Sequence, residues 1–232
     1  MSRAVTRNVC AALVGAACAL AGLAANAPPA AASITCTNNS AHCYSVLRAS
    51  GTTFYGMYGT WARAAMNAPG SDYFNGYFIT SEMWAMPAGA GWVETGLAQG
   101  YFDPTGLVGY YALGVYGTAS GGYAVHSFGL KPQNATVTDE FQISRGTSAN
   151  TWRVYCDGAL WTTPALGFWT VNWLDVGSEV YGSSVTASQF TMYVKGFNSA
   201  SAKVNLGFQF AEVSPGMNGS SPANSTWRWS VR

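Results

Sequence analysis

The sequence has almost no stretch with the periodicity of a helix. It consists instead of short runs rich in Tyr, Phe, Trp, Val and Thr between Gly, Asn and Pro residues. Runs of this kind are typical of strands joined by tight turns. Asp157-Gly158 stands between two of them and predicts a two-residue hairpin, because a type I′ turn needs positive φ at both central positions. We therefore predict an all-β fold, an antiparallel two-sheet β-sandwich of the jelly-roll or concanavalin-like type.

The predicted strands are distributed along the chain without a linker, charge run or internal repeat, so we expect a single domain. A helix-like stretch over 61–67 interrupts them, and 169–175 fits either a helical turn or a strand. The strands are expected at residues 53–60, 73–86, 92–101, 108–116, 122–130, 136–144, 151–156, 159–161, 177–181, 189–196, 203–210 and 226–231.

The first 32 residues have the features of a secretory signal peptide. Arg3 and Arg7 precede an apolar, Ala-rich stretch over 10–25, and Ala30-Ala31-Ala32 offers the small residues of a cleavage site. The apolar stretch is short for a membrane span. We predict a secreted, extracellular protein with one domain over residues 33–232, and no membrane association once the signal is removed.

Charged residues make up 9% of the chain, and the formal net charge is +1. Proteins that bind nucleic acids carry clustered positive charge, so we expect no binding of DNA or RNA. Hydrophobic residues at 49% and aromatic residues at 14% are sufficient for one large core. We expect the mature protein to be a monomer.

Three cysteines follow the predicted cleavage site. Cys36 and Cys43 flank a short polar loop, and in an oxidising compartment we expect them to form a disulfide. Cys156 shares a strand face with Trp152 and Val154, which predicts a buried free thiol rather than a nucleophile. Thiol catalysis would also need a histidine base, and the chain has two histidines, His42 and His126.

Most catalytic motifs are absent from the sequence. It contains no HExxH pair, no GxSxG nucleophile elbow, no phosphate-binding glycine loop and no dinucleotide fingerprint. We therefore predict no metal site and no cofactor, and carboxylates are the catalytic groups that remain.

Two of the five glutamates stand out by their neighbours. Alternation places Glu94 on one strand face with Trp92, and places Glu179 on one face with Gly177 and Tyr181. A carboxylate near an aromatic ring suits a partly desolvated groove, where one carboxyl stays protonated while its partner ionises. The simpler alternative is that both glutamates are ordinary surface acids.

Several motifs together resemble the catalytic domain of the neprosin-type glutamic endopeptidases, over about residues 54–184. They are Phe54-Tyr55-Gly56-Met57, Phe78-Ile79-Thr80-Ser81-Glu82-Met83-Trp84, Trp92-Val93-Glu94-Thr95-Gly96 and Gly177-Ser178-Glu179-Val180-Tyr181-Gly182-Ser183. The family's cysteine pair after the strand that corresponds to 122–126 is missing here, and the stretch before the first matching strand is short for its pro-segment.

The resemblance implies a β-sandwich with two catalytic glutamates on its concave face, which correspond to Glu94 and Glu179. It further implies a secreted, acid-active and metal-independent endopeptidase that favours cleavage after proline. Trp92 and Tyr181, which neighbour the two glutamates, are then the candidate substrate-binding residues, and the substrate would be a polypeptide, including proline-containing ones.

Two other functions fit the same residues. Paired carboxylates also serve glycoside hydrolases, so Glu94 and Glu179 could act on a polysaccharide. A non-catalytic β-sandwich could instead bind a carbohydrate or a surface by stacking Trp161, Trp169 and Trp173 on it, although core packing is the simpler role for each of these rings.

Overall fold

The computed structural model describes residues 34–36, 42–69, 76–87, 89, 91–101, 108–199, 202–214, 217–223 and 225–231. Strands and their connections make up these residues, and no helix occurs among them. None of the described segments is a helix that could span a membrane. The strands belong to a compact unit over residues 31–232, whereas the predicted signal peptide lies outside the described residues.

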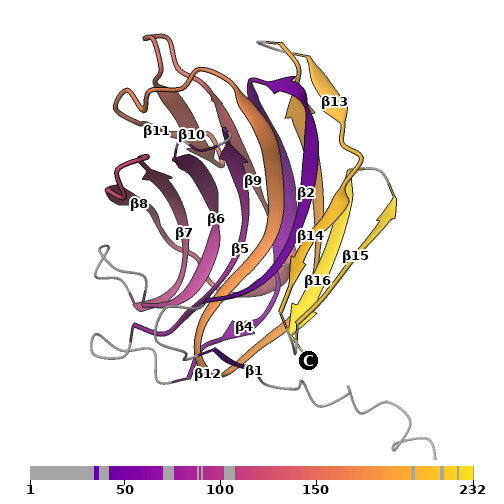
Figure 1. Cartoon of the computed structure of the whole chain (residues 1–232). Coiled ribbons are helices and arrows are strands. Elements are labelled where there is room, and N and C mark those ends of the chain that lie inside the picture. The colour runs from indigo at the N-terminus through magenta and orange to yellow at the C-terminus, as the bar shows by residue number, and fades with distance from the viewer. Residues whose placement is uncertain are drawn as a thin grey trace, which may run out of the picture. The chain divides into compact units, whose positions relative to one another are not determined.

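The strands form two antiparallel layers (Figure 1). In the first sheet the order is β14 (Gln209–Val213), β2 (Cys43–Phe54), β12 (Val171–Phe197), β5 (Phe78–Met86), β6 (Trp92–Tyr101), β7 (Val108–Gly117) and β8 (Tyr123–Leu130). In the second sheet the order is β11 (Ala159–Thr162), β10 (Trp152–Cys156), β9 (Asn134–Arg145), β3 (Gly56–Arg63), β12, β16 (Thr226–Val231) and β15 (Met217–Ala223). The short strands β1 (Ile34–Cys36), β4 (Met66–Asn67) and β13 (Lys203–Asn205) also pair with β12.

The strand β12 belongs to both sheets. Its first part, from Val171 to Tyr181, pairs with β2 and β5, and its second part, from Thr186 to Phe197, pairs with strands of the second sheet. Gly182, with a φ of 133°, and Ser184, with a φ of 57°, lie where the partners change. This backbone conformation lets one 27-residue strand cross from one layer to the other.

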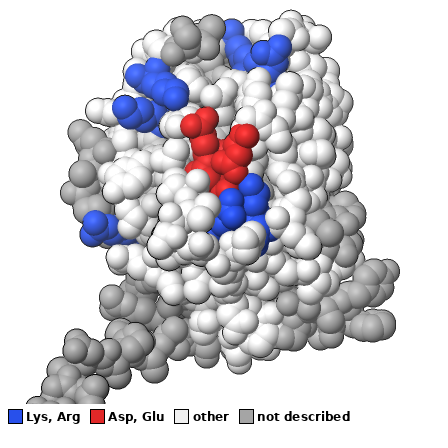
Figure 2. Space-filling view, turned by 180° about the vertical axis from the view of Figure 1, so that it is seen from behind, with Lys and Arg blue, Asp and Glu red and all other residues white. Residues whose placement is uncertain are grey.

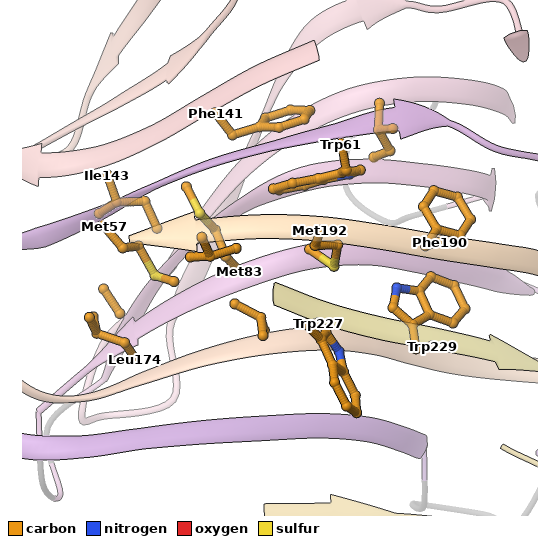
Figure 3. Packing of buried hydrophobic residues seen from close by; sticks show 14 of the residues in the cluster. Met57, Trp61, Met83, Phe141, Ile143, Leu174, Phe190, Met192, Trp227 and Trp229 are labelled. Atoms are coloured by element: carbon orange, nitrogen blue, oxygen red, sulfur yellow. The ribbon is translucent and has the colours of Figure 1, made fainter. Parts of the chain in front are cut away.

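The core lies between the two sheets and is rich in aromatic residues (Figure 3). Trp61 stacks on Phe141 with ring centroids 4.3 Å apart, and Phe190 stacks on Trp229 at 4.7 Å. Alternation along β12 points Leu174, Val176 and Val180 into this core and leaves Asp175 and Glu179 on the outer face of the first sheet.

The structure confirms the predicted all-β, antiparallel two-sheet sandwich and the hairpin at Asp157-Gly158, whose φ values are 48° and 80°. The prediction of a helix-like stretch over 61–67 is wrong, because β3 continues to Arg63 and β4 follows at Met66. Burial of Trp61 and Met66 in the core and pairing with β9 and β12 outweigh the local helical tendency.

Of the two predictions about the cysteines, the described residues test one. Cys156 is a buried free thiol, as predicted, and burial raises the pKa of its thiol to about 12. The strand register places Cys36 opposite Gly182 and Cys43 opposite Val180 along β12. The Cys36 side chain lies outside the described residues, so the Cys36–Cys43 disulfide stays a prediction.

Candidate active site

A groove of about 950 Å³ runs over the outer face of the first sheet, on the side away from the core. Alternate residues of four neighbouring strands point into it, because every second side chain of a strand faces the same side. Its acidic and aromatic lining includes Glu94, Glu179, Asp175, Trp84, Trp92, Phe78, Tyr44, Tyr101, Tyr123 and Tyr181.

Glu94 lies on β6 and is 4% exposed. Burial raises the pKa of its carboxyl well above 4.5, and the negative charge of Glu179 acts in the same direction. Hydrogen bonding by the Trp84 and Trp92 indoles opposes this shift less strongly. Glu94 therefore favours its protonated form.

Glu179 lies on β12 among groups that favour a carboxylate. The Tyr44 hydroxyl donates to its Oε1 at 2.9 Å, and His42 Nδ1 pairs with the same oxygen. The Thr80 hydroxyl accepts a hydrogen bond from the backbone N–H of Glu179 at 2.9 Å, which holds this point of β12 against β5. Hydrogen bonds and a nearby positive charge both stabilise an ionised carboxyl.

His42, in turn, is held by Glu179. The hydrogen bond to Glu179 raises the pKa of the imidazole above 6.5 against the effect of partial burial, and the negative charge of Glu179 adds to the increase. The ring also lies against Phe78, with centroids 5.5 Å apart, and against Tyr181, at 5.3 Å. The imidazole of His42 therefore favours its protonated form and lies beside Glu179 in the groove lining.

The structure adds a third carboxyl, that of Glu82 on β5. It is completely buried, and neither of its oxygens has a hydrogen-bond partner among the described residues. Burial raises the pKa of this carboxyl well above 4.5, and the charges of Glu94 and Glu179 raise it further, while the nearby Thr80 hydroxyl opposes the shift more weakly.

The strand register places the three glutamates on one diagonal. Glu82 is opposite Gly96 of β6 and Gly177 of β12. Glu94 lies two residues from Gly96, and Glu179 lies two residues from Gly177, in opposite directions along the sheet. Diagonal neighbours on one sheet face are about 7–8 Å apart, so Glu82 lies between Glu94 and Glu179.

The groove also contains an ion pair. Arg48 donates to Asp175 through Nε at 2.9 Å and through Nη2 at 2.7 Å, and its guanidinium lies 4.4 Å from the ring centroid of Trp173. Burial raises the pKa of Asp175, although the hydrogen bonds and charge of Arg48 oppose the shift. Asp175 is thus paired with a cation, whereas neither Glu82 nor Glu94 forms an ion pair within the part of the chain that the structure describes.

All four site residues predicted from the sequence, Glu94, Glu179, Trp92 and Tyr181, line the groove. The three tryptophans considered for a stacking surface lie outside the groove lining. Trp161 stacks on His126 and Tyr116 at the core, and Trp169 and Trp173 contact Arg145 and Arg48.

Sequence reasoning did not select Glu82 or His42 as site residues. The signal for Glu82 was a glutamate inside the apolar run Phe78-Ile79-Thr80-Ser81-Glu82-Met83-Trp84. No local signal marks His42. Within the described residues, no group of three or more His, Cys, Asp or Glu side chains is arranged to hold a metal ion.

No protein-family model matches the sequence, and no curated protein matches it. Among solved structures, the chain is similar to SCP-B, a member of the eqolisin family of peptidases in complex with the tripeptide Ala-Ile-His. The TM-score is 0.54 at 10% identity, over 82% of this chain and 98% of that one. A β-glucanase of Bacillus licheniformis matches with a TM-score of 0.39 at 13% identity, over 89% and 95% of the two chains. At these identities the likeness to the eqolisin concerns the fold.

Proposed function

We propose that the protein is a secreted, acid-active glutamic endopeptidase-like hydrolase that cleaves peptide bonds with Glu94 and Glu179 and without a metal ion. The observation that carries the proposal is the opposite setting of two carboxyls in one groove. Glu94 is buried and favours its protonated form, whereas Glu179 accepts a hydrogen bond from Tyr44 and pairs with His42. Titratable groups with opposed environments are typical of a general acid and a general base.

We infer the catalytic roles of the two carboxyls from these two environments. Glu179 removes a proton from the water that attacks the scissile carbonyl, and Glu94 donates a proton to the leaving amide nitrogen. Tyr44 and His42 act through Glu179, because both bond to its Oε1 and hold the carboxyl in place. Trp92 and Tyr181 line the groove and would hold the polypeptide beside the two carboxyls.

Two comparisons support a peptide as the substrate. One solved structure with a similar fold is a peptidase in complex with a tripeptide. The glutamate motifs around Glu94 and Glu179 also resemble those of a peptidase family whose members favour proline-containing substrates. The substrate proposed here is therefore an unfolded polypeptide, including proline-containing ones.

The experiment is a digest of an unfolded, proline-containing protein across the acid pH range. We expect a bell-shaped profile that is unchanged by chelators, because one carboxyl must be protonated and the other ionised. Glu94→Gln and Glu179→Gln should each lower kcat by a factor of about 10²–10⁴. Glu140→Gln is the matched control, because Glu140 is exposed and bonded to Tyr58 on the second sheet.

Two outcomes would contradict the proposal. If the wild type hydrolyses a polysaccharide and no protein, and loses this activity in the same two variants, the protein is a glycoside hydrolase. If it binds a polysaccharide and hydrolyses nothing, the aromatic groove is a binding surface.

A further inference from the structure

Glu82 has no role in the reaction proposed above, although it lies between the two groups that perform it. Its side chain is completely buried, and both carboxyl oxygens lack hydrogen-bond partners within the described part of the chain. A buried, unpaired polar group costs roughly 1–3 kcal/mol. A valine or leucine at this place would avoid that cost, so the carboxyl calls for a functional explanation.

The neighbouring strand provides space for Glu82. A Cβ at Gly96, directly opposite on β6, would lie 2.5 Å from the Cβ of Glu82. No side chain fits there without displacing the glutamate. A Cβ at Gly96 would also lie 2.3 Å from the backbone oxygen of Ser81, so β5 and β6 approach closely here, and the strand register places Glu82 between Glu94 and Glu179.

The charges around Glu82 indicate a neutral carboxylic acid. The charged groups that act on it are Glu94 from β6 and Glu179 from β12, and both are acidic, while the Thr80 hydroxyl opposes their effect on the pKa of Glu82 more weakly. The nearby cations are engaged elsewhere, since Arg48 is paired with Asp175 and His42 with Glu179. Buried carboxyls without a cation keep their proton.

After the proposed hydrolysis, Glu179 carries a proton and Glu94 lacks one, which is the reverse of what the next turnover needs. After each turnover Glu179 holds the proton taken from water, and Glu94 has lost its proton to the leaving amine. Before the next turnover, one proton must leave Glu179 and another must reach Glu94. Glu94 is almost completely buried, which limits direct exchange with water.

We propose that Glu82 is a proton relay that carries a proton from Glu179 back to Glu94 after each turnover. Neither Glu82 oxygen is hydrogen-bonded to Glu94 or Glu179 in the structure, so the side chain turns toward each of them in succession. It gives its proton to Glu94 and then takes the proton from Glu179. All three carboxyls then regain their starting states, and no outside acid or base is consumed. Glu82 is a positioning residue, because it acts through Glu94 and Glu179 without touching the substrate. The inference rests on the proposed function.

The test is Glu82→Gln, which keeps the size and polarity of the side chain but cannot relay a proton. We expect the first turnover to keep its rate and later turnovers to slow by about tenfold or more. Rapid-mixing kinetics should therefore show a burst of one product per enzyme molecule, with little change in KM. Formate in the buffer should partly restore the steady rate, because a small acid can deliver the missing proton.

A second measurement does not depend on activity. The infrared spectrum of the wild type should keep the carbonyl band of a protonated carboxylic acid well above the usual pKa of glutamate, and the band should weaken in Glu82→Gln. If the variant shows no burst, has a kcat within about twofold of the wild type and keeps the full band, Glu82 is a packing residue. If Glu94→Gln and Glu179→Gln are also fully active, the proposed function itself is wrong.

Discussion

Acidic side chains are buried in both layers of the sandwich, but the two layers differ in whether these acids are paired with cations. In the second sheet, Asp139 is fully buried and receives hydrogen bonds from Arg63 at 2.7 Å, through both Nε and Nη2, and from Lys131 at 3.3 Å. Lys131 also pairs with Asp157 at 2.8 Å. Figure 2 shows one side of the molecule, on which the acidic side chains form a single patch with basic side chains directly against it.

In the groove of the first sheet, Glu82 is as fully buried as Asp139 and Glu94 is 4% exposed, yet neither forms an ion pair among the described residues. Charged residues make up only 9% of the chain. The two basic side chains of the groove, Arg48 and His42, are paired with Asp175 and Glu179, and not with Glu82 or Glu94. Buried carboxyls with strongly shifted protonation are typical of active sites. The comparison therefore separates buried acids that are paired with arginine or lysine, such as Asp139 and Asp175, from Glu82 and Glu94, which have raised pKa values and no ion pair among the described residues.

The largest expected difference concerns stability. Asp139→Asn leaves Arg63 and Lys131 without their shared partner, and breaking a buried ion pair costs about 3–5 kcal/mol. Glu94→Gln replaces a protonated carboxyl by a neutral amide and should leave the free energy of unfolding nearly unchanged. Urea unfolding of both variants against the wild type measures the two costs. Equal destabilisation by both substitutions would remove the distinction between the two layers.

The second expected difference is a dependence of stability on pH. Because the pKa values of Glu82 and Glu94 are raised in the folded protein, the unfolded chain loses these protons first as the pH rises above about 4.5. The contribution of these two groups to the free energy of unfolding is therefore highest below that pH and falls above it, by up to about 1.4 kcal/mol per pH unit for each group.

Glu82→Gln should remove one of these two contributions and flatten the curve. Urea midpoints taken at intervals from acid to neutral pH give the slope. Glu140→Gln, on the exposed side of the second sheet, is the control and should follow the wild type. A wild-type curve that rises toward neutral pH would mean that the groove carboxyls are ionised in the folded state.

The sequence predicted the parts of the site that depend on local alternation. Glu94 lies on one face with Trp92, and Glu179 on one face with Tyr181, because a strand of period two fixes these relations without any knowledge of its partners. The same reasoning placed Cys156 inward. The two-layer architecture followed from the short aromatic runs and their turns.

Non-local pairing produced the parts that the sequence did not predict. Eight of the nine residues of β5 are buried, so no alternation distinguishes Glu82, and its position follows from the register with β6 and β12. Strand β12 was predicted as two strands, at 177–181 and 189–196, since Gly182-Ser183-Ser184 is typical of a turn. Positive φ at Gly182 and Ser184 instead makes a bend within one strand.

The smallest expected effect concerns the two histidines, which allow a test of Glu179 without any activity measurement. His42 pairs with Glu179, which raises the pKa of its imidazole above 6.5. His126 stacks on Trp161, with ring centroids 5.2 Å apart, and burial lowers its pKa below 6.5. An NMR titration of the wild type should therefore show one imidazole on each side of that value.

Glu179→Gln removes the carboxylate and leaves the His42 ring against Phe78 and Tyr181. Partial burial then acts alone, so the pKa of His42 should fall to 6.5 or below, while His126 stays where it was. The stabilisation from the His42–Glu179 pair is present below pH 6.5 in the wild type and is lost as the pH rises through the raised pKa of His42. Because His42 is 38% exposed, solvent screening keeps this contribution small. If His42 titrates above 6.5 even in Glu179→Gln, a group other than Glu179 raises the pKa of the imidazole, and the pairing of His42 with Glu179 does not explain its titration.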